Sequence, residues 1–227
     1  MKKCKVNNCN GKHKAKGYCS KHYQQYLRCG EILDRTCKDL NEIVIYEDYA
    51  EIVIYNRQCE EIARALINLD DIDKIKDYKW YLDSKGYVYN TKVGLLHRFI
   101  MDCPSDKVVD HINHNSLDNR KSNLRVCSIQ QNMMNQQKQK RDTTSQYKGC
   151  YWSKKNKKWH ARIKVNDKHK HIGLYDSEET AAIAYDKAAI LHFGEFAFTN
   201  FPIENYIDYI LDLGLNPNDF NIDESAE

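Results

Sequence analysis

The sequence predicts a multidomain α+β protein, built from several small modules rather than around one large core. Three observations indicate this architecture. The net charge of +3 over 227 residues averages blocks of opposite charge. Cys and His residues concentrate near the N-terminus, and β-branched or aromatic runs recur later in separate places. A chain of this length commonly divides into more than one domain.

The charge blocks predict two surfaces that face a polyanion. Residues 1–28 contain eight Lys and Arg residues and no acid, and residues 138–170 contain twelve bases against two acids. By contrast, residues 31–83 contain fourteen acids against seven bases, and residues 204–227 contain seven acids and no base. Basic blocks of this kind suit nucleic acid, although any single one also fits an ordinary solvated face.

Hydropathy and cysteine usage predict a soluble protein of a reducing compartment. No run approaches the roughly 18 apolar residues of a membrane span, and no apolar stretch follows the basic start. We therefore expect no membrane partner and no secretion. Nine Cys residues at irregular intervals argue against a disulfide framework and favour metal binding.

Residues 1–30 are expected to form a zinc-finger-like element. Three thiols and one imidazole within nineteen residues can complete a tetrahedral Zn²⁺ shell, and the predicted ligands are Cys4, Cys9, Cys19 and His22. The Cys19-x-x-His22 spacing suits the start of a helix. Two alternatives stay open: Cys29 or Cys37 replaces one of these ligands, or the cluster is a set of buried free thiols.

Residues 31–95 are expected to form a small α+β platform without catalytic residues. β-Branched and aromatic runs at residues 43–46 and 52–55 predict a hairpin, and residues 87–89 predict another strand. Apolar residues at helical spacing predict a helix over residues 69–80. Trp80 is expected in the core.

Residues 96–137 have the order strand, polar loop, strand and helix, a compact ββα unit that seats one metal. The helix is expected to begin at Ser128, because Ser128-x-x-Gln131 is a capping box. Phosphodiester hydrolysis needs a base, and histidine, here His111, is a side-chain type with an unperturbed pKa near neutral. It also needs a hard cation, Mg²⁺ or Mn²⁺, for which Asp110 and Asn132 offer oxygen ligands.

The stretch from His97 to Asn132 resembles the phage and intron-encoded HNH homing endonucleases, in the branch whose final His is replaced by Asn. The shared motifs stand in the same order: His97-Arg98, Val109-Asp110-His111-Ile112-Asn113, Asp118-Asn119-Arg120, Asn123-Leu124-Arg125 and the helical Asn132. The resemblance implies that Asp110 and Asn132 bind the metal, that His111 is the general base and that Asn123 orients it. Asn119 competes with Asn123 for that role, and His114 is a possible accessory contact. His97 is expected to be structural.

Residues 146–203 predict a three-stranded antiparallel sheet packed on one helix. The strands are expected at residues 147–152, 159–165 and 169–175, and the helix after Ser177. Alternation places Ala161, Ile163 and Val165 on one face and His160, Arg162 and Lys164 on the other. Residues 138–145 are expected to be a linker. Residues 204–227 are expected to form a short helix, from residue 203 to 213, and a frayed acidic tail.

This module resembles the plant ethylene-response-factor (apetala-two) DNA-binding domain. The shared motifs include Tyr147-Lys148-Gly149, Ala161-Arg162-Ile163, Ala184-Tyr185-Asp186 and Asn200-Phe201-Pro202. The family reads DNA through its strands, which implies that DNA contacts Lys148, Gly149, Tyr151, Ser153, Lys155, Arg162, Lys164, His169 and His171. Where the family has mostly Arg and Trp, Tyr151, Ser153 and the two His residues imply a different target or weaker reading of bases.

The expected function is that of a site-specific HNH homing endonuclease. It would cut double-stranded DNA as a monomer in the cytoplasm of a host bacterial cell, without a small-molecule substrate. The alternatives are a DNA-binding regulator with an inactive nuclease core and an RNA-binding protein. The presence of Asp110, His111, Asn123 and Asn132 together weighs against the regulator.

Overall fold

The computed structural model describes residues 2–7, 9–32, 35–138 and 144–220, in which helices and strands are mixed as the sequence predicts. The chain divides into two compact units. The first comprises Met1–Pro104 and Asn113–Val126, and the second comprises Ser105–Ile112 and Cys127–Glu227. No helix in the described ranges is both long and apolar enough to cross a membrane. The finer six-part division stays a prediction.

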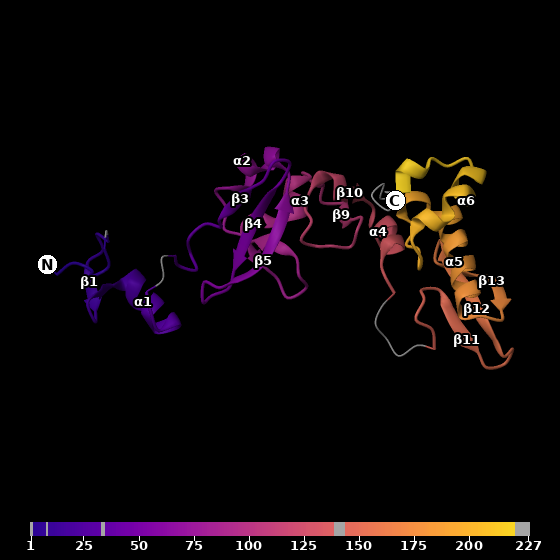
Figure 1. The fold of residues 1–227 in the computed structure, drawn as a ribbon, viewed down its shortest axis with the longest axis horizontal. Helices are drawn as coiled ribbons and strands as arrows, with labels where there is room; N and C mark the ends of the chain where they lie inside the picture. The colour runs from indigo at the N-terminus through magenta and orange to yellow at the C-terminus, as the bar shows by residue number, and fades with distance from the viewer. Residues whose placement is uncertain (1, 8, 33–34, 139–143, 221–227) are drawn as a thin grey trace. The chain divides into compact units, whose positions relative to one another are not determined.

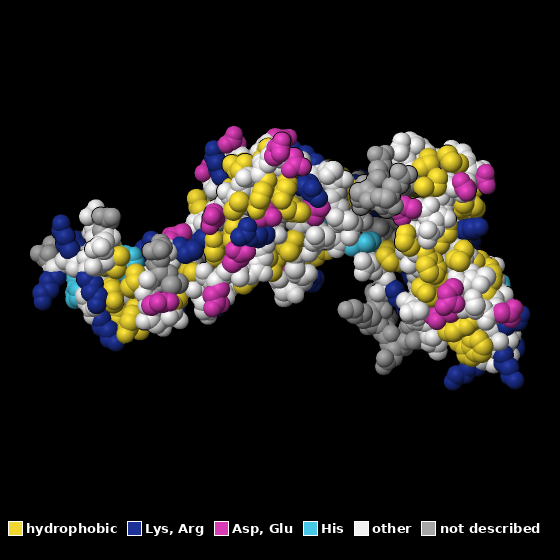
Figure 2. Space-filling view, in the orientation of Figure 1, with side chains coloured by type: hydrophobic (Ala, Val, Ile, Leu, Met, Phe, Trp, Pro, Cys, Tyr) yellow, Lys and Arg dark blue, Asp and Glu magenta, His cyan; other side chains and the backbone are white. Residues whose placement is uncertain are grey.

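The first unit begins with a small hairpin and one helix. β1 (His13–Ala15) pairs antiparallel with β2 (Tyr18–Cys19), and α1 (Ser20–Cys29) follows directly (Figure 1). Gly17 turns the hairpin at a φ of +85°, which glycine adopts without strain. The helix therefore starts between Cys19 and His22, as their spacing predicts. Lys and Arg side chains gather over this element (Figure 2).

The platform centres on three antiparallel strands in the order β3-β4-β5. These are β3 (Ile43–Ile45), β4 (Ala50–Tyr55) and β5 (Glu61–Ile67). The predicted hairpin of β3 and β4 is confirmed, but β5 is missing from the prediction. Charged residues interrupt its apolar pattern, since Glu61 and Arg64 pair with each other at 2.7 Å while Ala65 and Ile67 are buried.

The helix predicted over residues 69–80 is wrong beyond Ile75. A 3-10 turn, η1 (Leu69–Asp71), leads into α2 (Ile72–Ile75), and the chain then leaves the helical path. Burial of Trp80 explains this ending, because only 1% of the residue is exposed. Its backbone N–H donates to Oδ1 of Asn41 at 2.7 Å, and its indole N–H donates to the Ile75 carbonyl at 3.1 Å. Trp80 is thus a core residue, as expected.

A second sheet and a short helix complete the platform. β6 (Tyr81–Leu82), β7 (Val88–Asn90) and β8 (Gly94–Leu95) pair in sequence order, and α3 (Leu96–Ile100) follows. β7 confirms the strand predicted near residues 87–89. β9 (Val108–His111), η2 (Lys121–Asn123), β10 (Leu124–Cys127) and α4 (Ile129–Asn135) then follow in the predicted order of strand, loop, strand and helix.

The second unit contains the predicted three-stranded sheet on one helix. β11 (Cys150–Ser153), β12 (Lys158–Val165) and β13 (Lys168–Tyr175) pair antiparallel, and α5 (Glu178–Phe193) lies against them (Figure 1). Ala161 and Ile163 are buried against Ala181, Ala182 and Tyr185, which confirms the predicted faces. Small Ala side chains let the helix approach the sheet closely.

A buried carboxylate holds the chain after α5. Asp186 accepts hydrogen bonds from the backbone N–H of Asn200 and Phe201 and from the Tyr206 hydroxyl. The segment continues as η3 (Gly194–Phe196), η4 (Ile203–Tyr206), α6 (Ile207–Asp212) and η5 (Pro217–Phe220). The helix predicted from residue 203 to 213 is therefore half 3-10. Much of the predicted linker, residues 139–143, and the end of the tail, 221–227, lie outside the described residues.

Candidate functional site

Asp110 and His111 stand at the end of β9 in the second unit, and both are buried, with 7% and 6% of each residue exposed. Asn135 of α4 fixes this strand end. Its side-chain amide donates to Oδ2 of Asp110 at 2.8 Å and to the His111 carbonyl at 3.4 Å. Asp110 and His111 are thus consecutive buried residues at the end of β9. In a regular strand their side chains would point to opposite faces, so a site shared by both side chains stays a prediction.

The helix that supplies Asn135 has the predicted capping box. Oγ of Ser128 accepts from the Gln131 backbone N–H at 3.1 Å, and Oε1 of Gln131 accepts from the Ser128 N–H at 2.9 Å. Asn132 lies on this helix, half-buried, one turn before Asn135. A carboxylate and a side-chain amide oxygen are hard ligands that suit Mg²⁺, and the assignment of Asp110 and Asn132 as its ligands stays a prediction.

Asn123 lies in the first unit and closes a loop. Its Oδ1 accepts from the Asn113 backbone N–H at 2.9 Å, and its Nδ2 donates to the Asp118 carbonyl at 2.8 Å. Arg120 bonds both carboxylate oxygens of Asp118 at 2.8 Å. Burial would raise the pKa of Asp118, but the hydrogen bonds and charge of Arg120 outweigh it, and the pKa is lowered. The loop between Asn113 and Asn123 is therefore braced across its width.

The same loop is attached to the platform. The backbone N–H of Leu66 in β5 donates to the Leu117 carbonyl at 2.8 Å, and the Asn119 N–H returns a bond to the Leu66 carbonyl at 2.9 Å. The fully buried Asn119 also donates from its side chain to carbonyls of Ser116 and Leu117. Both Asn119 and Asn123 thus shape the loop, and the choice between them as the orienting residue stays a prediction. His97 is buried, and its ring lies beside that of Tyr87, which is consistent with the expected structural role. His114 has a positive φ of 62°.

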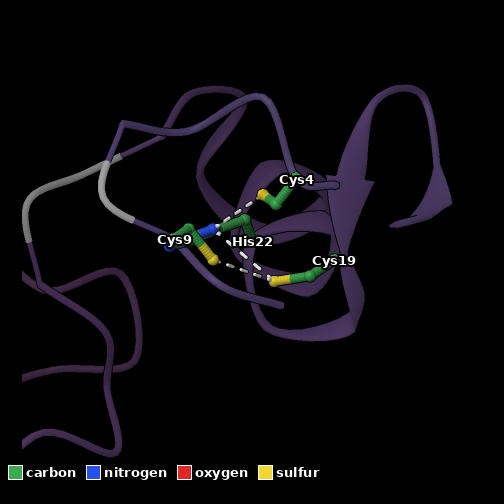
Figure 3. A group of neighbouring side chains, drawn as sticks. All are labelled: Cys4, Cys9, Cys19 and His22. Atoms are coloured by element: carbon green, nitrogen blue, oxygen red, sulfur yellow. Dashed lines mark hydrogen bonds between the residues drawn. The ribbon is translucent and has the colours of Figure 1, made fainter. Parts of the chain in front are cut away.

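The N-terminal cluster brings together all four predicted zinc ligands (Figure 3). Their ligand atoms lie within 4.8 Å of one another. The Cys9 and Cys19 sulfurs are 3.8 Å apart, and Nδ1 of His22 is 3.6 Å from the Cys19 sulfur and 3.2 Å from the Cys4 sulfur. A tetrahedral shell with ordinary Zn–S and Zn–N bonds has edges of about 3.8 Å between sulfurs and about 3.6 Å between sulfur and nitrogen. The geometry fits zinc.

Two further features support this cluster. Desolvation would raise the pKa of Cys4, but hydrogen bonds, the largest from His22, outweigh it and lower the pKa to about 6. A side chain at Gly11 would place its Cβ 2.6 Å from Cβ of Cys19, so only glycine fits there. Sequence reasoning missed Gly11. The alternative ligands lie outside the cluster: Cys37 accepts from Arg28, and Cys29 donates to the Gln58 carbonyl.

Most residues predicted to read DNA lie on the outer face of the C-terminal sheet. On this face Arg162, Lys164, His169 and His171 are exposed, while Tyr151 and Ser153 are half-buried; Lys155 is exposed in the turn between β11 and β12. Arg162 lies over the Tyr151 ring at 5.0 Å. His160 stacks on His171 with ring centroids 4.4 Å apart, and their facing nitrogens are in hydrogen-bonding contact. The alternation of the strand predicts His160 on this face, but the sequence analysis does not include it among the DNA contacts.

Lys148 and Gly149 have clear structural contacts instead. The Lys148 ammonium donates to the carbonyls of Met134 and Gln136, at 2.8 and 2.6 Å, at the end of α4. Burial lowers its pKa to about 8, although the Asp186 charge opposes this. Gly149 has a φ of +79°, and a Cβ there would lie 1.9 Å from the Tyr185 ring. Their contact with DNA stays a prediction.

Comparisons with known proteins agree with both resemblances. The family model described as HNH endonuclease matches residues 102–134. An uncharacterised HNH endonuclease of Acanthamoeba polyphaga mimivirus is 38% identical over 144 residues, which span 60% of this chain and 74% of that protein. Protein 3.8 of Escherichia phage T7 is 32% identical over 94 residues, 41% of this chain and 76% of the phage protein.

Plant proteins match a shorter stretch. An ethylene-responsive transcription factor of Arabidopsis thaliana is 43% identical over 75 residues, 32% of this chain but only 17% of the factor. This similarity fits a DNA-binding module of the ethylene-response-factor type fused to a nuclease. Because the mimivirus relative is matched over most of its length, the chain belongs to the HNH endonuclease family.

Proposed function

We propose that this protein is a site-specific DNA endonuclease that hydrolyses a phosphodiester bond with one divalent metal ion. The observation that carries the proposal is the buried pair Asp110 and His111, with Asn135 holding the carboxylate beside a helix that bears Asn132. Asp110 and Asn132 would hold the ion. When bound, the ion supplies positive charge that stabilises the phosphate and the leaving oxygen.

His111 then acts as the general base. Its imidazole takes the proton of the attacking water, a task for which histidine is the commonest side chain. Asn123 acts by bracing the loop after β9, through its bonds to the backbone at Asn113 and Asp118. Burial of the Asp110 and His111 pair excludes bulk water, which strengthens the electrostatic interactions within the site.

Recognition of the DNA site is assigned to the C-terminal sheet. Arg162 is the candidate for a guanine contact, and Lys155 and Lys164 for phosphates. The zinc-binding element would add a second basic surface. This division of labour is that of a homing endonuclease, in which binding modules choose the site and one small centre cuts.

The test measures cleavage and binding separately. Asp110→Asn and His111→Ala are compared with wild type for Mg²⁺-dependent cleavage of a randomised DNA pool, and for DNA binding without Mg²⁺. Both variants should lose cleavage and keep binding within a few-fold. His192→Ala, an exposed His on α5, is the matched control and should cut normally. If wild type binds DNA and does not cut it with any divalent ion, the protein is a regulator instead.

A further inference from the structure

A groove in the platform has the chemistry of a nucleotide-binding surface, although none of the functions above uses it. Its volume is about 640 Å³, within the range of ligand sites. Its walls come from α1, the ends of β4 and β5, and strands β6 and β7, all in the first unit. The lining residues that matter here are Arg28, Lys38, Arg57, Tyr55, Tyr81 and Tyr89. We call this the platform groove.

The charge of the groove is positive. Arg28, Lys38 and Arg57 also line an adjoining hollow of about 290 Å³, together with Lys21, which pairs with Asp39 at 3.5 Å. Neither hollow has an Asp or Glu among its described lining residues. Arg28 donates to the Cys37 thiol, a neutral partner, and in the described residues Lys38 and Arg57 have no ion pair. This charge suits a phosphate backbone.

The other half of the groove is aromatic. Tyr81 and Tyr89 face each other across the paired strands β6 and β7, with ring centroids 5.8 Å apart. Tyr55 lies beneath the Arg35 guanidinium, which is 3.3 Å from its ring centre, and its hydroxyl donates to Glu42. Tyrosines that only packed across a hairpin would not need to line a cationic groove. Aromatic rings beside cations are the usual platform for stacked bases.

The geometry points to single-stranded DNA as the occupant, and we propose that the platform groove binds it. Phosphates would contact Arg28, Lys38 and Arg57, and a base would stack on Tyr81 or Tyr89. A base inside a duplex has both faces covered by its neighbours, so only an unpaired strand can present a face to these rings. The proposal goes beyond duplex cleavage, because it assigns a further nucleic-acid site to a region without catalytic residues.

The test uses the full-length protein and a short deoxyoligonucleotide with a central 2-aminopurine, whose fluorescence is quenched by stacking. Binding is measured without Mg²⁺. Tyr89→Leu should weaken binding about tenfold and remove the quench, because stacking on one aromatic ring accounts for about that much affinity. Tyr89→Phe keeps the ring and should behave as wild type. Arg57→Gln, at an exposed position, should lower the salt dependence by about one phosphate contact.

The matched control is Tyr46→Leu. Tyr46 is exposed and stacks on the half-buried Tyr49 at 4.6 Å, in another tyrosine pair of the same platform that lies outside the groove. It should bind like wild type. The proposal is overturned if Tyr89→Leu and Arg57→Gln both bind as wild type, if Tyr46→Leu weakens binding equally, or if RNA of the same sequence binds more tightly than DNA. Thermal unfolding of each variant identifies any loss of fold.

These readouts are independent of the nuclease proposal. Loss of cleavage in His111→Ala with normal quenching would support both assignments. If the protein never cuts DNA but shows the Tyr89-dependent quench, the groove proposal is supported and the nuclease proposal is refuted. If wild type cuts duplex DNA normally but shows no quench, the nuclease proposal is supported and the groove proposal is refuted.

Discussion

The two predicted metal sites of this chain are built in opposite ways. At the N-terminus, four ligands from nineteen consecutive residues converge, and their spacing alone nearly defines the site. The predicted site at Asp110 depends on a distant partner, since Asn135, 25 residues further along the chain, holds the carboxylate. A structural metal folds its own element, whereas a catalytic metal needs a scaffold that is already folded.

Removing the N-terminal metal should have the largest effect and would break the comparison most visibly. In Cys19→Ser the zinc shell loses a thiolate, and residues 2–29 should lose their structure, because few residues other than the ligands are buried there. Amide signals of these residues in a two-dimensional NMR spectrum should collapse, while those of the platform persist. Cys103→Ser, outside the cluster, is the control. A folded element without bound zinc would refute the structural role.

The scaffold of the catalytic site can be tested through Asn135. Asn135→Ala removes the bond that orients Asp110, and cleavage should fall about 10- to 100-fold, as for other residues that position metal ligands. Higher Mg²⁺ should restore part of the loss. Gln130→Ala changes an exposed residue of the same helix and should leave cleavage unchanged. An equal loss in both variants would mean that the helix, and not the Asp110 bond, is at fault.

The same contrast explains which features of the fold and the candidate sites could be predicted from the sequence. The clustering of the four predicted zinc ligands, the capping box at Ser128 and the alternation around Ile163 depend on near neighbours, and all three are observed. The sequence missed β5, because Glu61 and Arg64 interrupt its apolar pattern. It also missed the early end of the helix at Ile75 and the contact of Asn135, and these two depend on partners far along the chain, Asn41 and Asp110 respectively.

Gly149 tests whether a residue assigned to DNA contact serves the fold instead. Gly149→Ala should destabilise the second unit by about 1–3 kcal/mol, because φ is positive and the new Cβ would collide with the Tyr185 ring. Gly214 also has a positive φ but open space around it, so Gly214→Ala should lose only about 1 kcal/mol. Thermal unfolding measures both. Equal losses would show that backbone strain alone acts at Gly149.

Lys148 should give the smallest effect, a change in the unfolding free energy with pH. Its pKa falls from about 10.5 to about 8 on folding, so between these values the unfolded chain binds more protons. Stability from this group should therefore rise with pH across that window. Denaturant unfolding of wild type and Lys148→Met at several pH values isolates the contribution of Lys148 to the pH dependence of stability. The raised pKa values of Cys150 and Tyr185 affect the unfolding free energy of both proteins equally. If the difference in unfolding free energy between wild type and Lys148→Met does not change with pH, the Lys148 ammonium is exposed to solvent and its pKa is not lowered.

The central claim, that His111 is the base of the cutting centre, is tested most directly by chemical rescue. Single-turnover cleavage by His111→Ala is measured with and without free imidazole, at saturating Mg²⁺ and DNA. We expect the variant to be about 10²- to 10⁴-fold slower than wild type, the usual contribution of a general base. Added imidazole should restore part of the rate, increasingly as pH rises through its titration. Cleavage by the variant at the wild-type rate would contradict the assignment.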